Sequence, residues 1–443
     1  MDSRYTATLL CCVAPAHGRP GVPVEVRDPI HGPIAVNDAE RCILDHPFVQ
    51  RLRHIKATGF SYLPFPGATH SRYAHSLGVM HLAGRAVDSV FDGGALSPEH
   101  VARFRSLVRM GALCHDLGHA PFSHSTEFAM PPLSELNLSW YSKEAQEERR
   151  ATHEDYTIAI LAHTSLAAML AENFEFTARH VAALISQDVT VVDDLFEVDG
   201  LNYRQVLSQI ISSELDVDRL DYLVRDSYFT GARYGQVDVP WLISNMATFA
   251  EDGDVSLALD HSALYAFDDF LIARHHMFLM VYFHHKSVVY EELLKRFVWD
   301  GDWSITADLD AYLWLDDIAL DAHLRTSGDA WARRIVEHDP YRRVLEVHGT
   351  PADVDLASHV QTLTSAGIDV IQAGSTGKLS RYNVFGQKRE KAGQIALLPG
   401  SSGSQVTTLQ EESRVLQGYA NARRIARLYV APEEVAAAQE LLR

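Results

Sequence analysis

The sequence predicts a mainly α-helical fold, with a small mixed helix/strand unit at the C-terminal end. Two observations support this prediction. Apolar residues recur at three- and four-residue spacing through 75–91, 99–119 and 268–297, which is the period of a helix with one buried face. Strand-like runs are short and lie mainly near the two ends, at 24–36, 391–400 and 422–432.

The expected elements follow in chain order. Residues 24–36 predict a short hairpin, and residues 41–57 predict a helix that is followed by a Gly- and Pro-bearing loop at 59–69. The helices at 75–91 and 99–119 come next. Thr152 and Asp155 stand at capping-box spacing and predict a further helix start. Helices are expected to continue to about residue 299, including 212–229 and one long helix over 268–297.

These elements divide the chain into three expected segments. Residues 1–23 contain Pro15, Pro20 and Pro23 and predict an irregular tail. Residues 24–299 form the main helical domain, and residues 300–443 form a mixed unit of short helices and strands that suits oligomerisation or regulation.

Charge and composition exclude several classes of protein. The formal net charge is −19, whereas a protein that coats nucleic acid needs a basic surface. No apolar run approaches the roughly 20 residues of a membrane span. The four cysteines have no C-x-x-C spacing, which favours reduced thiols and a cytoplasmic location.

Histidines are concentrated in the stretch GALCHDLGHAPFSHSTE, residues 111–127. If the helix at 99–119 is continuous, His115 and His119 share one face, and Asp116 lies beside them. Gly118 and Pro121 are expected to end that helix and to carry His124 into the loop. Imidazole and carboxylate ligands with open positions suit Fe, Mn, Ni or Zn, so the pattern favours a metal site that activates water.

The wider pattern resembles a known family. The motifs DPIHG, PFVQRLRHIK, FPGATHSRYAHSLGV, CHDLGHAPFSH, LDVDRLDYLVRD and VYFHHK occur in this order between about Val24 and Lys295. They are similar to the HD-domain deoxynucleoside triphosphate triphosphohydrolases, in the branch of the sterile-alpha-motif and HD-domain enzyme and its bacterial relatives. The resemblance implies an HD-domain helical core. It also implies hydrolysis of a deoxynucleoside triphosphate to nucleoside and inorganic triphosphate by metal-activated water.

The resemblance also assigns site residues by position. Its metal ligands are His75, His115, Asp116 and Asp218, and magnesium could accompany the triphosphate. Its catalytic group is Asp116 with the histidines around the reacting phosphate, His119, His124 and His153. Its substrate contacts are Arg72, Arg219, Tyr222, Asp226, Arg274 and Tyr282, of which 219, 222 and 226 share a helix face.

Two positions depart from the family pattern. Members carry Gln-Leu after the RLRxIK motif to read the sugar, and here Ala57 and Thr58 stand in their place. Asp45, Gln50 and Arg53 match positions that bind a guanine nucleotide activator in some members, but the basic residue that accompanies them is missing from the preceding strand. A helix that packs at a subunit contact explains this trio equally well.

Alternative functions stay open at this point. One is an HD phosphohydrolase that acts on a ribonucleotide, a nucleoside monophosphate or a guanosine alarmone. Another is a nucleotide-sensing oligomer with little turnover, and a weaker one is cleavage or binding of nucleic acid. The family resemblance further implies a homo-oligomer, with a tetramer favoured over a dimer through the 41–57 helix and the C-terminal unit.

Overall fold

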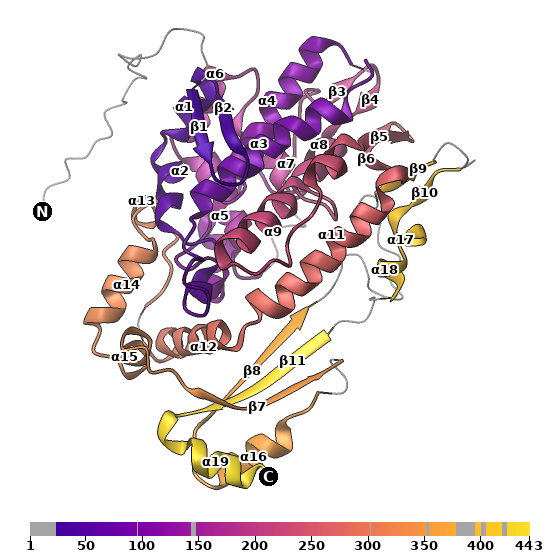
Figure 1. Cartoon of the computed structure of the whole chain (residues 1–443). Coiled ribbons are helices and arrows are strands. Elements are labelled where there is room, and N and C mark those ends of the chain that lie inside the picture. Colours follow the sequence, from indigo (N-terminus) through magenta and orange to yellow (C-terminus); the bar gives the residue numbers. More distant parts are fainter. Residues whose placement is uncertain are drawn as a thin grey trace, which may run out of the picture.

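The computed structural model describes residues 24–94, 96–142, 148–301, 303–350, 354–377, 395–399, 405–418 and 423–443. Helices form the large upper body in Figure 1, and a three-stranded sheet with two helices lies below it. The predicted fold class, mainly α with small mixed sheets, is therefore confirmed. The tail expected for residues 1–23 lies outside the described residues.

The N-terminal hairpin is confirmed, but the helix predicted for 41–57 is wrong as one element. A proline holds the preceding residue out of the helical region. Here His46, just before Pro47, is extended with φ −64° and ψ 137°, and the helix breaks there. The observed elements are β1 (Val24–Asp28), β2 (Gly32–Val36), α1 (Asp38–Leu44), α2 (Pro47–Arg51) and the 3₁₀ turns η1 (Leu52–His54) and η2 (Gly59–Tyr62).

The helical body packs around one long central helix, α3 (Arg72–Val90), which contacts α4, α8 and α9. The predicted capping box is confirmed at the start of α5, where Thr152 and Asp155 bond to each other's backbone. The other elements of the body are α4 (Pro98–Cys114), η3 (Ser123–Ala129), η4 (Leu133–Leu136), α5 (His153–His163), α6 (Leu166–Asn173), α7 (Ala178–Ile185), α8 (Arg204–Ile211) and α9 (Val217–Thr230).

Helices do not continue unbroken to residue 299 as predicted. After α10 (Val239–Ser244), strands β5 (Met246–Glu251) and β6 (Asp254–Asp260) form an antiparallel hairpin. Asp252 and Gly253 connect them with φ of 55° and 91°, which is the left-handed turn that Asp-Gly favours. Shorter strands extend this sheet, namely β3 (Glu197–Val198), β4 (Leu201–Asn202), β9 (Ala396–Leu398) and β10 (Thr407–Thr408).

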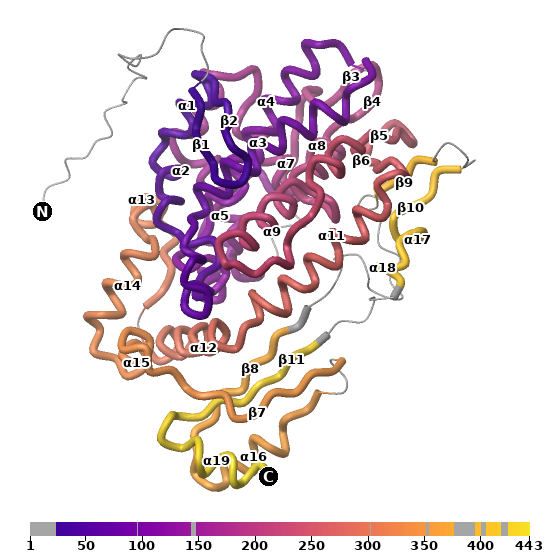
Figure 2. The backbone as a smooth tube through the Cα atoms, viewed as in Figure 1, coloured from indigo at the N-terminus to yellow at the C-terminus, as the bar shows by residue number. Residues whose placement is uncertain are grey.

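The helix predicted over 268–297 is also interrupted. It divides into α11 (Leu264–Met277), a π-helical turn η6 (Phe278–Tyr282) and α12 (His285–Asp300), whose N-cap is His284. Figure 2 traces α11 running down beside the helical body to α12, which lies next to the lower sheet. The break turns Tyr282 toward α9, where its hydroxyl donates to Asp226 at 2.6 Å.

The C-terminal unit holds an antiparallel sheet of order β7-β11-β8, built from β7 (Arg342–Gly349), β11 (Arg423–Val430) and β8 (Val370–Gly377). The strand predicted around 422–432 is confirmed as β11. The one around 391–400 is confirmed as a strand, β9, but its predicted place in the C-terminal unit is wrong, because β9 pairs with β6 of the helical body. The sequence reading missed β7 and β8. The accompanying helices are α13 (Leu309–Tyr312), α14 (Asp317–Thr326), α15 (Ala330–Val336), α16 (Ala357–Ser365), α17 (Leu409–Glu412), α18 (Arg414–Gly418) and α19 (Val435–Leu441).

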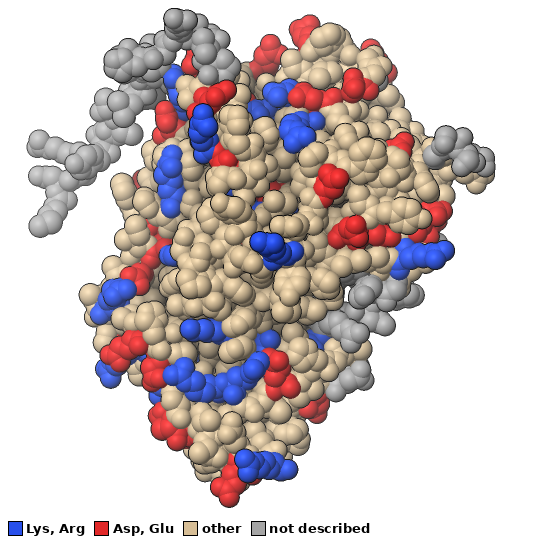
Figure 3. All heavy atoms as spheres, in the orientation of Figure 1, with Lys and Arg blue, Asp and Glu red and all other residues tan. Residues whose placement is uncertain are grey.

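Surface charge is mixed in sign on the face that Figure 3 draws. Acidic and basic side chains are interspersed over the helical body, and one arc of basic side chains lies near α12 and the lower sheet. Within the described part of the chain, every helix is too short or too polar to traverse a lipid bilayer.

Candidate active site

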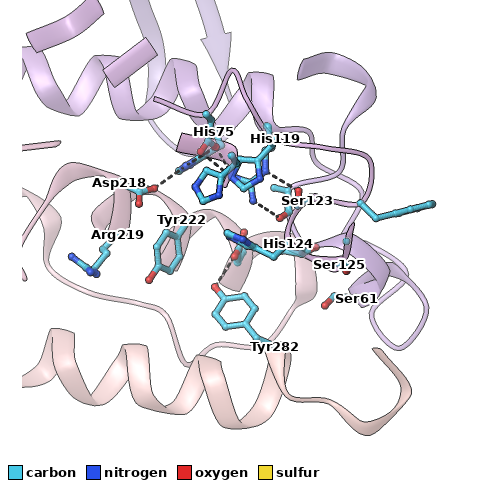
Figure 4. Close-up of a pocket in the computed structure, with 18 of the residues that line it drawn as sticks. Ser61, His75, His119, Ser123, His124, Ser125, Asp218, Arg219, Tyr222 and Tyr282 are labelled. Atoms are coloured by element: carbon cyan, nitrogen blue, oxygen red, sulfur yellow. Dashed lines mark hydrogen bonds and ion pairs between the residues drawn. The ribbon is translucent and has the colours of Figure 1, made fainter. Parts of the chain in front are cut away.

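A pocket of about 580 Å³ lies between the helical body and the C-terminal sheet. Its walls come from α3, the turn after α4, η3, α9, α11 and α12, and Gly374 and Ser375 of β8 also contribute. Figure 4 shows His75, Asp218 and Arg219 toward one end and Ser61 and Ser125 toward the other, with His124 between them. The pocket has a volume in the range that small-molecule ligands occupy.

The four residues that the sequence assigned as metal ligands meet at one end of this pocket. His75 Nε2 lies 3.0 Å from Asp218 Oδ1 and 3.7 Å from Asp116 Oδ2. His115 Nε2 lies 3.3 Å from Asp116 Oδ1 and 3.6 Å from Asp218 Oδ1. The side chains therefore arrive from α3, from the turn after α4 and from the start of α9, within reach of one ion.

The donor set fits a divalent cation. His115 donates from Nδ1 to the carbonyl of Ala112 at 2.7 Å, which leaves the lone pair on Nε2. That Nε2 is buried, and no described residue gives it a hydrogen bond. Burial opposes a charge on His75, yet hydrogen bonds to Asp218 and Asp221 raise its pKa to about 10. The carboxylates thus attract positive charge to this point, which a metal ion would supply.

A second layer of polar contacts holds His75 in place. Its Nδ1 lies 2.7 Å from Asp221 Oδ2, while Asp221 Oδ1 lies 2.6 Å from His31 Nε2. Arg225 donates from Nε to Asp221 and from Nη1 to Asp28, at 2.8 Å each. A histidine that bonds a carboxylate through Nδ1 presents Nε2 as its ligand atom, so this chain of contacts orients the proposed ligand.

The helix that leads to His115 and Asp116 ends earlier than predicted. α4 stops at Cys114, His115 is its C-cap, and residues 115–118 form turns. His115 and His119 therefore do not share a helix face. Gly118 explains the tight path, because a Cβ there would lie 2.0 Å from the carbonyl oxygen of His153. The turn lets Asp116 lie between His115 and His119, whose Nε2 is 3.2 Å from Asp116 Oδ1.

The three catalytic histidines of the prediction gather beside this cluster. The rings of His119 and His153 stack with centroids 4.0 Å apart, and His124 meets their edges at 4.8 and 5.1 Å. Glu127 joins two of them, with its carboxylate 2.7 Å from His153 Nδ1 and 3.1 Å from His124 Nδ1. One donor atom from each of the three histidines lies within 4.8 Å of the others, so they face a common point.

The loop before His124 has an unusual backbone. Phe122 and Ser123 have φ of 56° and 57°, a left-handed conformation that costs a non-glycine residue about 1–3 kcal/mol. Two contacts offset that cost, since Asp317 accepts from the Phe122 amide at 2.6 Å and Arg72 donates from Nε to Ser123 Oγ at 2.7 Å. Arg72 also donates to Asp116 at 2.5 Å, so one arginine links the loop to the proposed metal ligands.

The predicted substrate contacts on α9 do share the pocket wall. Arg219, Tyr222 and Asp226 all line the pocket, together with Arg274 and Tyr282 from across it. Acidic partners hold both arginines, because Arg219 pairs with Asp216 and Arg274 lies 3.2 Å from Glu214. Asp226 accepts from Tyr282 and also contacts His70 Nε2 at 2.7 Å.

The two positions that depart from the family pattern also lie in this pocket, whereas the trio of the activator hypothesis does not. Ala57 and Thr58 line the pocket. Gln50 donates to the carbonyl of Leu44 and accepts from Arg53, whose guanidinium lies 3.6 Å over the ring of Tyr73. Asp45 is exposed nearby on the helical segment.

Sequence reasoning missed several residues that the site uses. Asp221 and His31 orient His75, Glu127 bridges two histidines, Ser123 binds Arg72, and Glu291 lines the far end of the pocket. The motif DPIHG was a usable signal for His31, because it preceded the metal motifs without an assigned role. Spacing gave no signal for Glu127 or Glu291.

Comparison with known proteins identifies the family to which the chain belongs. The model of the HD domain matches residues 72–226, and the model of the HD-associated region matches residues 237–369. The chain is an HD-domain protein. A crystal structure of a hypothetical protein from Aquifex aeolicus has a TM-score of 0.71 and 25% identity, and the match covers 95% of this chain and all of that one.

Relatives of this HD-domain protein come from all three domains of life. It is 31% identical to the uncharacterized protein MJ1154 of Methanocaldococcus jannaschii over 72% of this chain and 59% of that protein. It is 36% identical to YwfO of Bacillus subtilis over 61% of this chain and 54% of that one. It is 33% identical to human deoxynucleoside triphosphate triphosphohydrolase SAMHD1 over 46% of this chain and 33% of that enzyme. The chain thus spans little more than half the length of the first two relatives.

Proposed function

We propose that this HD-domain protein is a metal-dependent phosphohydrolase that cleaves deoxynucleoside triphosphates into deoxynucleoside and inorganic triphosphate. The observation that carries the proposal is the content of one pocket. It combines the His75, His115, Asp116 and Asp218 cluster with three arginines, Arg72, Arg219 and Arg274. The similarity to SAMHD1, whose name states this activity, supports the choice of substrate.

His75, His115, Asp116 and Asp218 would hold the ion, for which Fe, Mn, Ni and Zn are the candidates. A divalent ion bound there lowers the pKa of water and offsets phosphate charge. The arginines have the matching role for the substrate, because guanidinium groups bind phosphate oxygens in bidentate fashion. Asp216 and Glu214 fix two of these arginines before the substrate arrives, so less side-chain freedom is lost on binding.

The histidines would supply the proton for the leaving group. Partial desolvation at the pocket wall and the charges of Arg72 and His153 lower the pKa of His124, while its hydrogen bond to Glu127 opposes this shift. A bound triphosphate would raise the pKa of His124 and favour its protonated form. The imidazolium could then protonate the departing 5′ oxygen, with His119 and His153 placed to bind phosphate oxygens.

The aromatic and acidic residues across the pocket suit the sugar. The rings of Tyr222 and Tyr282 have centroids 6.3 Å apart, and Asp226, which accepts from the Tyr282 hydroxyl, can also accept from a sugar hydroxyl. A second candidate substrate is a ribonucleoside triphosphate. Thr58 favours it, since its buried Oγ1 has no partner within the described residues and could bind a 2′-hydroxyl.

We also propose that the protein forms a homo-oligomer in the cytoplasm, with a tetramer favoured over a dimer. Trp314 and Ile318 are 77% and 61% exposed at the junction of α13 and α14, and exposed apolar groups of this size favour a protein contact. The four cysteines of the chain have no C-x-x-C spacing, which suits a reducing compartment. Light scattering with and without nucleotide measures the assembly, and a monomer in both states would contradict it.

Product identification tests the proposed activity. The purified protein is incubated with each deoxy- and ribonucleoside triphosphate, with nucleoside monophosphates and with a guanosine alarmone, in Mn, Fe, Co, Ni or Mg. Release of nucleoside and inorganic triphosphate from a deoxynucleotide is the expected result. Release of pyrophosphate or single phosphate, or turnover of the alarmone alone, would replace the proposal with another phosphohydrolase activity.

A further inference from the structure

Glu291 is a carboxylate in the pocket for which the proposed reaction has no use. It lies on α12 and lines the pocket with Ser125 and Ser61. Ser125 Oγ donates to Glu291 Oε1 at 3.1 Å. Within the described residues, this is its one hydrogen bond, and no lysine, arginine or histidine pairs with it. A carboxylate can accept about four hydrogen bonds, so most of its capacity remains available to a ligand.

The adjacent residue on the same helix behaves differently. Glu292 lies 2.8 Å from Lys295 Nζ and 3.1 Å from Arg296 Nη1, and it does not line the pocket. Burial raises the pKa of Glu291 to about 7, although the hydrogen bond from Ser125 and the charge of Lys295 act in the opposite direction. Glu291 is partly buried at the pocket wall, so a ligand in the pocket can reach its free acceptor positions.

The position of Glu291 in the pocket indicates which part of a ligand it meets. Ser125 and Ser61 lie toward the end opposite Asp218 and Arg219 in Figure 4. The loop at Thr58 and Gly59 also lies at this end, because a Cβ on Gly59 would be 2.8 Å from Ser125 Oγ. A carboxylate would repel the phosphates, so a nucleotide with its phosphates at the arginines turns its nucleoside toward Glu291.

This end of the pocket offers surfaces that suit a planar base. Phe122 and Val288 line the pocket and belong to one apolar cluster with Phe60, on which Phe122 stacks with centroids 4.6 Å apart. Aromatic and apolar faces bind the flat side of a base, while a polar group at the edge distinguishes one base from another. Glu291 is the acidic residue at that edge.

Base chemistry then selects among the nucleotides. Guanine has two adjacent donors, N1–H and the exocyclic amine, and these match the two oxygens of one carboxylate. Adenine and cytosine place a ring acceptor beside their amine, and thymine places carbonyls on both sides of its single N–H. We propose that Glu291 recognises the base of the bound nucleotide and selects guanine. This inference rests on the proposed function, since it deepens the substrate class of the same pocket.

The test compares Glu291→Gln with wild type on dGTP, dATP, dCTP and dTTP. Glutamine keeps the size but replaces one acceptor with a donor, so kcat/KM for dGTP should fall at least about tenfold, mostly through KM. The value for dTTP should change by less than about threefold, which also shows that the variant folds. Glu292→Gln is the matched control and should leave the ratio of dGTP to dTTP unchanged. An equal loss on all four substrates, or no loss on dGTP, would overturn the inference.

A binding measurement distinguishes failure of this inference from failure of the proposed function. With a chelator present to stop turnover, calorimetry measures binding of dGTP and dTTP to wild type and Glu291→Gln. If no triphosphate is hydrolysed but dGTP binding still depends on Glu291, base selection stands and the proposed hydrolysis fails. If all four are hydrolysed and bound in unchanged ratios by the variant, hydrolysis stands and base selection is wrong.

Discussion

Nδ1 of His75 lies 2.7 Å from Oδ2 of Asp221, and this contact aims Nε2 of the same ring at Asp218. Asp221 is fully buried and is itself fixed by Arg225 and His31. The orientation of the proposed metal ligand is thus set by a residue one helical turn beyond Asp218, on the same helix.

Replacing Asp221 with Asn should therefore weaken metal binding. The variant keeps the shape but loses the charge that orients His75, and the loss of such a partner typically costs 10–100-fold in metal affinity. Competition with a chromophoric chelator gives the affinity, and circular dichroism checks the fold. Asp88 lies on α3, as His75 does, and forms an exposed ion pair with Arg105 of α4, so Asp88→Asn is the control and should have no effect. Unchanged metal affinity in Asp221→Asn would contradict the orienting role.

Asp218 itself should be required for metal and for turnover. Its carboxylate lies 3.0 Å from His75 Nε2 and 3.6 Å from His115 Nε2, and although burial opposes ionisation, the two rings hold its pKa well below the usual range. Asp218→Ala should lose bound metal and activity, while its far-ultraviolet spectrum stays that of wild type. A purified variant with full metal content and full activity would exclude Asp218 as a ligand.

His124 should act as the proton donor. The His124→Ala variant should lose about 10²–10⁴ in kcat, the usual contribution of a general acid, with metal content unchanged. Glu127→Gln should lower kcat by less, because it only weakens the hydrogen bonds that position His124 and His153. The exposed His163, at the end of α5, offers a control substitution to Ala. Activity of His124→Ala within a few-fold of wild type would rule out this role.

Base selection by Glu291 should depend on pH. Burial raises its pKa to about 7, with lesser effects of Lys295, which lowers it, and Glu292, which raises it. Above that pH the ionised carboxylate accepts from both guanine donors, whereas below it the protonated carboxyl presents a donor of its own. The ratio of kcat/KM for dGTP to that for dTTP should rise between about pH 6 and about pH 8. A ratio that is flat in wild type, or that rises equally in Glu291→Gln, would contradict the assignment.

The sequence predicted the helical class and most of the elements, because helical periodicity and capping residues are local signals. The prediction failed where a proline or a turn interrupts the helical pattern of apolar residues. Pro47 divides the 41–57 helix, the Asp252–Gly253 turn forms a hairpin, and the turn after Cys114 ends α4. β7 and β8 were missed because each strand is stabilised by pairing with β11, which follows them in the chain.

The site residues also divide into those that a local motif predicted and those that it did not. His115, Asp116, His119 and His124 stood out in one stretch, and the family motifs supplied His75 and Asp218. Asp221, Glu127 and Glu291 could not be found, since their roles depend on partners far away in the sequence. Glu127 contacts His153 across 26 positions, and Glu291 meets Ser125 across 166. Such distances leave no periodic pattern to read.

Sugar selection should be weaker than the family pattern implies. Ala57 and Thr58 line the pocket where the family carries Gln and Leu, and Ala57 gives no hydrogen bond to a 3′-hydroxyl. Thr58 Oγ1 is buried and has no partner within the described residues, so a 2′-hydroxyl could satisfy it. A hydrogen bond of this kind contributes about 0.5–1.5 kcal/mol, which is around tenfold at most. Deoxynucleotides should therefore be cleaved, with only modest preference over ribonucleotides.

The measurement pairs dGTP with GTP and dATP with ATP, for wild type and for Ala57→Gln combined with Thr58→Leu. The double change restores a donor for the 3′-hydroxyl and places a branched side chain against C2′, so the ratio of deoxy- to ribonucleotide turnover should rise about tenfold. Thr69→Leu, on the exposed loop outside the pocket, serves as the control. If wild type already rejects ribonucleotides and the double change alters nothing, another part of the pocket reads the sugar. Asp226 and Tyr282, joined at 2.6 Å across the pocket, would then be the next residues to substitute.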